Sequence, residues 1–404
     1  MILTIHRGTH QIGGCVTELR TDTTCILIDL GSPLPGPDGA VPKEPLSLPG
    51  VTAPGTPCDG VFFTHNHGDH IGQIGCILPE VPLFLGETAR EVALALHRRL
   101  ARHDAESCAP TLAALERAHT FRPGVPLTVG NLCITPLLVD HSAFDAYMFM
   151  IEGNGVRILH TGDFRNHGPR GKALYLVLRR YVGQVDWLIC EGTTLSRPRQ
   201  PTLTEWELGR RARAIIQKHR HVFVVCASTN IDRIAVFAHH TPRRRPVVCD
   251  FYQKELLNLV QAHSGDKSSF YRFDRVIPYS DRNAKLLRWM ENQGFVMFVR
   301  ANDRFRQFME SYRNNCVVLY SMWGGYLDGP CANPSLLQLL EGFSVIRLHT
   351  SGHADQNTLR EVYRIQQPRC GIIPIHGEQP EMFRRLAPGC PVLCLEDGDS
   401  LMLA

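Results

Sequence analysis

The apolar positions in the first 190 residues form short runs, and most of these runs end at a polar residue. Runs such as residues 25–28 and 61–63 are too short for helices and are typical of buried strands. The turn at Gly153-Asn154-Gly155 separates two further runs and predicts a hairpin. The predicted strands cover residues 2–5, 15–19, 25–29, 61–63, 132–139, 147–151, 156–160 and 185–190.

The pattern changes further along the chain. Residues 87–100 and 205–216 repeat apolar side chains every three or four positions, which predicts helices with one buried face. Between residues 196 and 343, helical segments alternate with short strands, as in an α/β domain. Further strand-like runs follow at residues 344–348, 371–375 and 392–395. Eight prolines between residues 33 and 57 predict a long irregular loop.

The length and composition are those of a globular protein with two domains. The chain has 404 residues, of which 44% are hydrophobic and 20% charged. No apolar run approaches the roughly 20 residues that cross a bilayer, so no membrane association is expected. The N-terminus carries no export signal, and we expect a cytoplasmic protein whose 14 cysteines are reduced.

The net charge of +4 is unevenly distributed. Residues 197–245 contain eleven Lys and Arg against three Asp and Glu, which gives this segment a net charge of +8. Such a segment is a candidate binding surface for a polyanion. The alternative is a solvent-exposed helix face that happens to be basic.

Residues 64–70, Thr-His-Asn-His-Gly-Asp-His, follow a predicted strand directly and carry four potential metal ligands. An extended segment can aim His65 and His67 at one point. Gly68 then allows a sharp turn, after which Asp69 and His70 can point at a second, neighbouring point. Imidazoles with a carboxylate suit zinc better than calcium or magnesium, which prefer oxygen ligands.

Several other strands end in the same way, with a residue of ligand type that is usually beside a glycine. A single acid or histidine at a strand end is commonly a cap or a solvated turn residue. A recurrence along the chain instead predicts a sheet whose ends converge on a metal centre. These strand ends are Asp29, residues 65–70, His141, Asp163, Glu191 and His376.

The sequence resembles the metallo-β-lactamase fold and, more closely, its β-CASP branch of nucleases, typified by ribonuclease J. The branch is indicated by Glu191 in Glu-Gly-Thr-Thr, His353 in Ser-Gly-His-Ala, His376 in Pro-Ile-His-Gly-Glu and residues 227–234. The chain resembles a short form, without room for the C-terminal domain of ribonuclease J. The resemblance implies a four-layer αββα sandwich, formed by residues 1–195 and 344–404, with an inserted α/β β-CASP domain at residues 196–343.

The resemblance also implies a site with two zinc ions, or manganese as the alternative metal. His65, His67 and His141 would hold one ion, and Asp69, His70 and His376 the other. Asp163 would bridge the two ions. Catalytic roles are implied for Asp69, Asp29, Glu191 and His353. His353 would donate a hydrogen bond or proton to the phosphate or leaving oxygen, whereas Asp29 and Glu191 would orient imidazoles. A strand-end acid is the alternative for Glu191.

Nucleic-acid contacts are expected from Arg233, Arg197, Ser351 and Trp323. Arg233 would hold backbone phosphates, and Trp323 and Tyr326 could stack bases, with core packing as the alternative for both aromatic residues. Ser351 could bind phosphate or simply form a turn.

The expected function is zinc-dependent hydrolysis of single-stranded RNA by a metal-activated hydroxide. Cleavage could be internal or proceed from a 5′ end, and a homodimer is an open alternative. His376 favours RNA, because DNA-specific relatives tend to have an apolar residue there. A DNA-processing nuclease and a small-molecule hydrolase of thioesters or lactones are the rival predictions.

Overall fold

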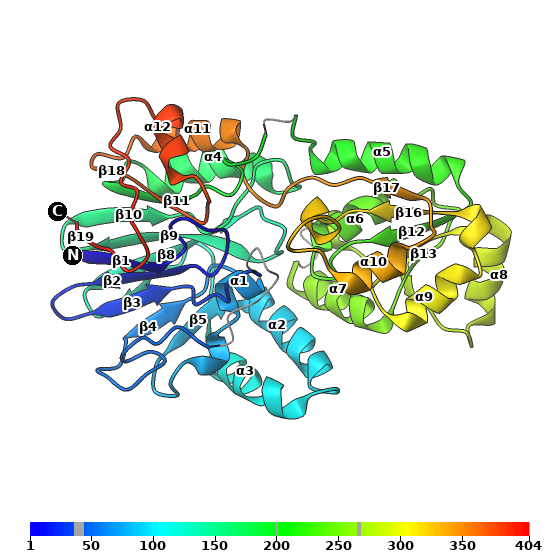
Figure 1. Ribbon diagram of the computed structural model, residues 1–404, viewed down its shortest axis with the longest axis horizontal. Coiled ribbons are helices and arrows are strands. Elements are labelled where there is room, and N and C mark those ends of the chain that lie inside the picture. The colour runs from blue at the N-terminus through cyan, green and yellow to red at the C-terminus, as the bar shows by residue number, and fades with distance from the viewer. Residues whose placement is uncertain (36–43, 199–200, 265–267, 404) are drawn as a thin grey trace.

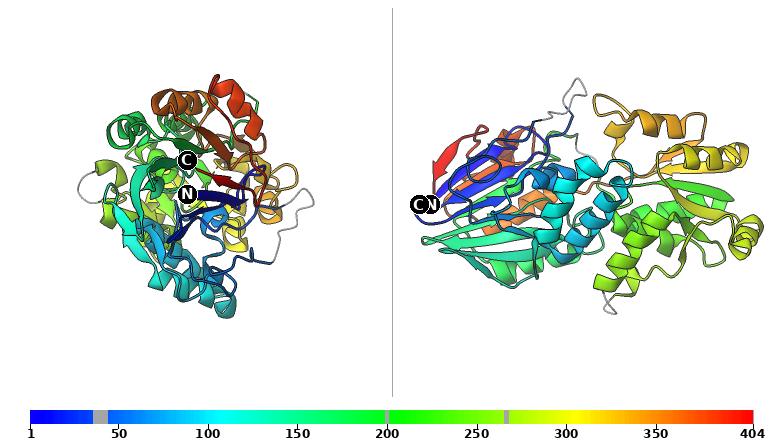
Figure 2. Two further views of the ribbon diagram at one scale, coloured as in Figure 1. Left: turned by 90° about the vertical axis from the view of Figure 1, so that its left-hand side faces the viewer. Right: turned by 90° about the horizontal axis from the view of Figure 1, so that it is seen from below.

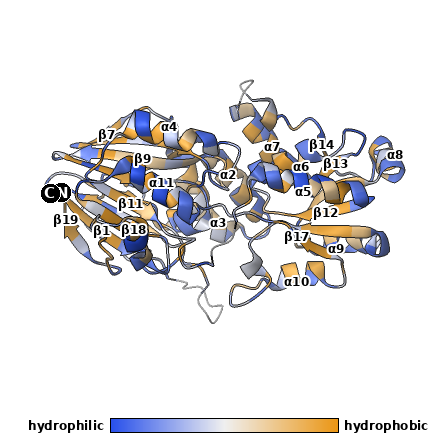
Figure 3. Cartoon of the chain, turned by 90° about the horizontal axis from the view of Figure 1, so that it is seen from above, coloured by the Kyte–Doolittle hydropathy of each residue, from blue (hydrophilic) through white to orange (hydrophobic). Residues whose placement is uncertain are grey.

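The computed structural model describes residues 1–35, 44–198, 201–264 and 268–403, and three sheets organise them (Figure 1). Figure 1 shows two sheets together in one half of the molecule and the third in the other half. Figure 3 shows that the hydrophobic residues concentrate on the strands of all three sheets.

The first two sheets pack face to face, and helices cover their outer faces. Apolar side chains such as Ile28 and Phe62 of the first sheet meet Phe149 and Ile373 of the second in a shared core. The outer face of the first sheet packs against α1 (Gly68–Ile71), α2 (Glu87–Leu100) and α3 (Ala105–Arg117). The outer face of the second packs against α4 (Leu174–Val177), α11 (Gln356–Gln366) and α12 (Phe383–Leu386). This arrangement confirms the predicted αββα sandwich.

The strands of the sandwich have the following order. The first sheet runs β19 (Ser400–Met402), β1 (Ile2–Arg7), β2 (Val16–Arg20), β3 (Cys25–Ile28), β4 (Gly60–Phe62), β5 (Leu83–Gly86), β6 (His119–Phe121). The second runs β18 (Gly371–Ile375), β11 (Trp187–Glu191), β10 (Val156–His160), β9 (Ala146–Gly153), β8 (Leu132–Val139), β7 (Leu127–Val129). Because β1 pairs with β19, the two ends of the chain lie side by side (Figure 2).

The third sheet is entirely parallel and has helices on both faces, so its strands are almost continuously apolar. Its order is β14 (Val276–Pro278), β13 (Val247–Cys249), β15 (Phe295–Val299), β12 (His221–Val225), β16 (Cys316–Tyr320), β17 (Val345–Arg347). One face packs against α5 (Glu205–Lys218), α6 (Ile231–His240) and α7 (Phe251–Ser264). The other packs against α8 (Ala284–Gln293), α9 (Asp303–Glu310) and α10 (Pro334–Leu340).

The third sheet is an insertion between two neighbouring strands of the sandwich. The chain leaves the sandwich after β11, builds the third sheet, and returns as β18, which pairs with β11 in parallel. In this register Glu191 lies opposite Ile375, the residue before His376. The insertion therefore brings Glu191 and His376 to the same edge of the second sheet.

Two sequence predictions are wrong in detail. The run at 344–348 forms β17 of the third sheet, so the inserted domain extends past the expected boundary at residue 343. Residues 392–395 form no named strand, because only Val392 bridges to Ile372, and the last strand is instead β19. Residues 36–43 of the proline-rich loop lie outside the described residues. No helix among the described residues is long and apolar enough to span a bilayer.

Candidate metal centre

All seven predicted metal ligands meet at one edge of the sandwich. They follow the ends of β4, β8, β10 and β18, and part of the set lies in the short helix α1. Their ligand-type atoms lie in groups in which every pair is within 4.8 Å. Two of these groups are His65, His67, His141 and Asp69, His70, His376, and Asp163 belongs to groups that overlap both.

Asp163 lies at the centre of the cluster. Its Oδ2 is 3.1 Å from His70 Nε2, 3.7 Å from His376 Nε2 and 3.8 Å from His141 Nε2. On one side, His67 Nδ1 lies 3.2 Å from His141 Nε2. On the other side, His376 Nε2 lies 3.3 Å from Asp69 Oδ2. Asp163 therefore lies within reach of both ligand groups.

The residues present fit a metal. His65 Nε2, His70 Nε2 and Asp163 Oδ1 are buried and have no hydrogen-bond partner among the described residues. Buried polar atoms are costly unless they are satisfied, and most in folded proteins have a partner. A divalent cation would satisfy these atoms, and a set of imidazoles with carboxylates suits zinc.

The protonation states also suit a cation. Burial lowers the pKa of His65, His67 and His141, so these imidazoles are neutral at pH 7 and each offers a lone pair. Burial also acts to lower the pKa of His70, but the charges of Asp163 and Asp29 raise it. Because ligands must be deprotonated, metal binding here would release protons.

Hydrogen bonds outside the cluster fix how its imidazoles point. His70 Nδ1 donates to Asp29 Oδ2 at 2.8 Å, which turns Nε2 toward Asp163. His141 Nδ1 donates to the Gly352 carbonyl oxygen at 2.7 Å. His376 Nδ1 lies 2.7 Å from Thr193 Oγ1. Such carboxylate and carbonyl contacts select the tautomer of a ligating histidine.

The backbone is unusual at two of these positions. Asp29 and His376 both follow buried strands and adopt positive φ angles of 61° and 51°. Non-glycine residues rarely adopt this left-handed region, and it costs on the order of 1–3 kcal/mol. Asp29 is held there by hydrogen bonds from Thr64 N at 2.7 Å and Thr64 Oγ1 at 2.8 Å. Turns of this kind redirect each side chain into the cluster.

Glu191 and His353 form a pair at the side of the cluster. Glu191 Oε2 lies 3.3 Å from His353 Nδ1, and His353 Nδ1 lies 3.6 Å from Asp163 Oδ2. Glu191 is fully buried and accepts hydrogen bonds from the backbone of Phe164 and Ala354, whereas the His353 side chain is 19% exposed. Glu191 thus lies beside an imidazole that solvent can reach, and its orienting role stays a prediction.

Three of the predicted nucleic-acid residues gather near this exposed imidazole. The Arg197 guanidinium lies 5.8 Å from the centre of the Trp323 ring, and Tyr326 contacts the same indole edge-on at 5.4 Å. Trp323 is 38% exposed, so core packing does not describe it. Burial and the charge of Asp69 raise the pKa of Tyr326, which places its hydroxyl within electrostatic range of the cluster. Ser351 Oγ accepts a hydrogen bond from the His353 backbone at 3.1 Å.

The prediction that Arg233 holds nucleic-acid phosphates is wrong. Its side chain is fully buried and forms two 2.8 Å hydrogen bonds to Glu205. It also donates to Ser321 and to the Thr350 carbonyl oxygen. From the sequence, Arg233 is one basic residue in a basic segment. The sequence does not reveal that the folded protein buries its side chain.

Arg233 belongs to a buried group of charges that sequence reasoning missed, which we call the arginine network. It joins the sandwich to the inserted domain and contains Asp140, Arg165, Arg170, Glu205, Asp232 and Arg233. Asp140 precedes the ligand His141, and Arg165 comes two residues after Asp163. The positions of Asp140 and Arg165, which are close to predicted metal ligands in the sequence, were the one signal that could have indicated the network.

The remaining basic residues of segment 197–245 lie mostly on the surface. Arg245 is buried and donates to the carbonyl oxygens of Ile216 and His219. Arg199 lies outside the described residues. The exposed residues are Arg210, Arg211, Arg213, Lys218, Arg220, Arg243 and Arg244. Most of the segment is therefore a solvent-exposed basic face, which fits both a binding surface for a polyanion and the alternative of a solvated helix face.

Comparison with known proteins identifies the family of the fold. Residues 24–224 match the beta-lactamase superfamily domain, and residues 343–387 match the Zn-dependent metallo-hydrolase RNA specificity domain. The chain is 24% identical to ribonuclease J of Helicobacter pylori strain J99, across 98% of this chain and 59% of that protein. It is 22% identical to ribonuclease J of Mycoplasma genitalium, across 92% of this chain and 67% of that protein.

The chain therefore spans about three fifths of the length of the Helicobacter relative. Among solved structures, it resembles a protein of unknown function from Enterococcus faecalis V583. That likeness has a TM-score of 0.78 at 21% identity and covers 100% of this chain and 99% of the other. It supports the fold of the complete chain.

Proposed function

Because this chain belongs to the metallo-β-lactamase superfamily, we propose that it hydrolyses phosphodiester bonds of single-stranded RNA with metal ions held by the cluster. One observation carries the proposal. Seven ligand-type residues meet at one point, three of them carry buried atoms that lack partners among the described residues, and the partly exposed His353 lies beside Asp163. Ligands, an acid-base group and an approach for substrate are thus present at one point.

The residues divide the chemistry between them. Two zinc ions held by the two ligand groups would supply Lewis acidity and an activated water at neutral pH. His353 would donate a hydrogen bond or a proton to the phosphate or to the leaving oxygen. Glu191 would hold the His353 imidazole through the 3.3 Å contact, so that its other nitrogen faces the substrate. Asp29 would keep His70 in the tautomer that presents Nε2.

RNA is supported as the substrate by three separate observations. The match to the RNA specificity domain covers residues 343–387, which include both His353 and His376. In addition, Arg197 and the exposed Trp323 present a cation and an aromatic face beside the site. A cation for the phosphate and a ring for the base are the elements with which proteins bind single strands. The ribonuclease J relatives, by their name, also act on RNA.

The test is cleavage of matched single-stranded RNA and DNA, each with a 5′-monophosphate, by zinc-loaded protein. We expect cleavage of the RNA. The variant His353→Ala should lose about 10²–10⁴-fold in rate while it retains its bound zinc, because general acid–base groups contribute that much. His10→Ala, which changes an exposed histidine outside the cluster, is the control.

The products and the alternatives are read from the same experiment. Labels at either end of the RNA separate internal cuts from trimming at the 5′ end. Cleavage of DNA alone would contradict the RNA assignment and the weight given to His376. A protein that binds zinc but cuts neither strand would contradict the nuclease assignment and bring forward a small-molecule hydrolase.

A further inference from the structure

We propose that a surface patch on the inserted domain binds single-stranded RNA apart from the metal cluster and holds a part of the strand that does not react. The inference rests on the proposed function and adds a second binding surface to it. The patch is formed by the start of α5, the end of α6 and the short helix η5 (Ser269–Tyr271). Its aromatic residues are Trp206, His239, His240 and Phe270, and its cations are Arg210 and Arg213.

The aromatic side chains of the patch form a connected group that reaches solvent. Trp206 is 41% exposed, and its ring lies 5.4 Å from the ring of Phe270 and 5.5 Å from that of His240. His239 stacks on Phe270 at 5.0 Å with an interplanar angle of 12°. Phe270 and His240 thus support the indole while part of its surface stays open. A base without a pairing partner can stack on such a ring.

Helical spacing brings cations to the same face as Trp206. Residues 206, 210 and 213 are four and three positions apart, so their side chains lie in one row along α5. Arg210 lies 3.9 Å from Glu207, whereas Arg213 forms no ion pair among the described residues. The Arg213 guanidinium is exposed and remains available to a phosphate from solution.

The arginine network links the patch to the metal cluster. Glu205, which precedes Trp206 on α5, accepts a 2.8 Å hydrogen bond from Arg165. Arg165 in turn comes two residues after Asp163. The patch and the cluster are therefore connected through the network but share no residue. Only a strand that extends beyond the cluster can occupy both, so the patch would favour longer RNA.

The chemistry of the patch favours a single strand over other anionic partners. A duplex keeps its bases stacked inside and offers none to Trp206. An acidic protein would pair with Arg213 and leave the aromatic group without a planar partner. A single strand supplies both phosphates and unpaired bases. The surrounding segment 197–245, with a net charge of +8, attracts the same ligand.

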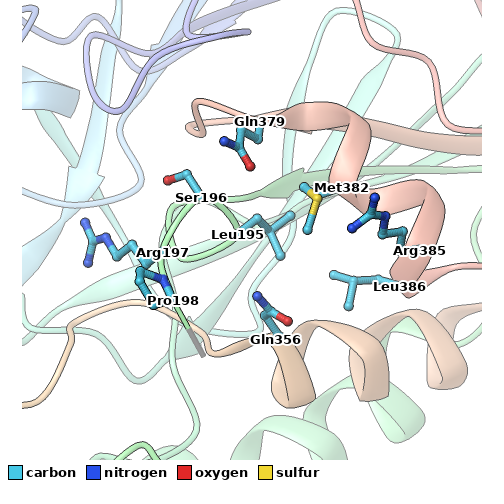
Figure 4. A pocket seen from close by; sticks show the side chains of 9 residues that line it. All are labelled: Leu195, Ser196, Arg197, Pro198, Gln356, Gln379, Met382, Arg385 and Leu386. Atoms are coloured by element: carbon cyan, nitrogen blue, oxygen red, sulfur yellow. The ribbon is translucent and has the colours of Figure 1, made fainter. Parts of the chain in front are cut away.

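A cavity in the sandwich does not offer the same combination (Figure 4). It has a volume of about 440 Å³, and Figure 4 shows Arg197 and Arg385 on opposite sides of it. Among the described residues that line this cavity, none is aromatic, so it contains no ring on which a base could stack. The patch on the inserted domain is therefore the better candidate for holding unpaired bases.

The experiment compares two exposed arginines of α5. Arg213 lies in the row with Trp206, whereas Arg211 lies on another face of the same helix. Arg213→Gln and Arg211→Gln remove the same charge from the same helix, so a general electrostatic effect is similar for both. Each change is made in zinc-loaded His353→Ala protein, and binding of fluorescein-labelled single-stranded RNA is measured by anisotropy. Thermal unfolding verifies that the variants are folded.

We expect Arg213→Gln to weaken binding of single-stranded RNA about tenfold, as the loss of a hydrogen bond to a charged group does, and Arg211→Gln to change it by less than about twofold. Trp206→Ala should also weaken it about tenfold, because it removes the stacking of a base. Trp206→Phe, which keeps a ring, should retain most of the binding. Binding of the matched RNA duplex should be the same with Trp206→Ala as without it.

Three results would overturn the proposal. Equal effects of the two arginine variants would show that the charge of the surface matters and the row does not. Unchanged single-strand binding by Trp206→Ala, or an equal loss of duplex binding, would show that no base stacks on the indole. Competition by polyglutamate as effective as that by unlabelled single-stranded RNA would assign the surface to an acidic protein.

The two proposals fail separately. If wild-type protein cuts no RNA while the Arg213-specific loss of binding persists, the catalytic assignment fails and the patch stands. If wild-type protein cuts RNA while the two arginine variants bind it equally, the patch fails and the catalytic assignment stands.

Discussion

The metal cluster and the arginine network are two groups of buried charge that lie beside each other, and they differ in how their atoms are satisfied. In the network, each carboxylate has a cationic partner: Glu205 accepts from Arg165 and Arg233 at 2.8 Å, and Asp232 lies 3.3 Å from Arg170. In the cluster, His65 Nε2, His70 Nε2 and Asp163 Oδ1 have no such partner among the described residues.

This difference indicates that the arginine network has a structural role, whereas the metal cluster is a candidate binding site. Both groups consist of residue types that are seldom buried, and burial alone would single out either of them. The network balances three arginines with three carboxylates across the domain interface and needs no further ion. In the cluster, the neutral imidazoles of His65, His67 and His141 instead offer lone pairs that a cation would satisfy. Unpartnered atoms gathered within one group of ligand-type residues, more than burial alone, therefore indicate the site.

The largest expected effect comes from removing the shared carboxylate of the cluster. We expect Asp163→Asn to lower the RNA cleavage rate by about 10³-fold or more, since metal-ion catalysis contributes several kcal/mol to transition-state stabilisation. The zinc content after dialysis should fall as well. Asp22→Asn, at an exposed position, is the control. Full activity of Asp163→Asn would remove the metal from the mechanism.

The next largest effect concerns the network and should appear in stability. Arg233→Met should lower the free energy of unfolding by about 3–5 kcal/mol, because it leaves Glu205 with an incomplete set of cations in a buried site. Denaturant unfolding measures the change, and the exposed Arg210→Met is the matched control. Weaker RNA binding by Arg233→Met at unchanged stability would instead restore Arg233 as a phosphate contact.

Acid should weaken the network through Glu205. Burial acts to raise its pKa, but Arg233 and Arg165 lower it to about 2 from an ordinary value of 4.5. Because the folded-state pKa is the lower one, the stabilisation is present above about pH 4.5 and is lost as the pH falls toward 2. The loss is about 3 kcal/mol from this group. Glu205→Gln should flatten this part of the stability profile; an unchanged profile would contradict the assignment.

The smallest of the four effects tests the hydrogen bond by which Asp29 orients the predicted ligand His70. Asp29→Asn retains the side-chain shape but removes the charge that accepts from His70 Nδ1. We expect zinc affinity to fall 10–100-fold, as is usual when a partner of a ligating histidine is lost. Competition with a zinc chelator measures it. Unchanged affinity would mean that the position of His70 is set by its backbone alone.

The sequence predicts the metal cluster well because each ligand follows an apolar strand. Strand ends such as Asp29, His141 and Asp163 can be read from the alternation between apolar runs and polar residues. The parallel pairing of β11 with β18 then brings residues 191 and 376 together, and no local pattern contains that pairing. The resemblance to a known family, and not a local pattern, assigned Glu191 and His376 to the same site.

The network and the strand details could not be predicted in the same way. Arg233 looks like its basic neighbours, and it is buried by contacts with Glu205, Ser321 and Thr350, which are distant from it in the sequence. Residues 344–348 and 392–395 both look like strands, but only the first finds an open neighbour, β16, along its length. For Trp323 the sequence left nucleic-acid contact and core packing open, and its exposure in the structure speaks against core packing.

The insertion between β11 and β18 also has a consequence for biosynthesis. A ribosome that has translated the chain through Glu191 has made six of the seven ligands, but it must make the whole inserted domain before His376 is added. At about 5–20 residues per second, this interval lasts roughly 10–40 s. A nascent chain that ends before residue 353 lacks both His353 and the seventh ligand, so the site can be completed only after the inserted domain has been translated.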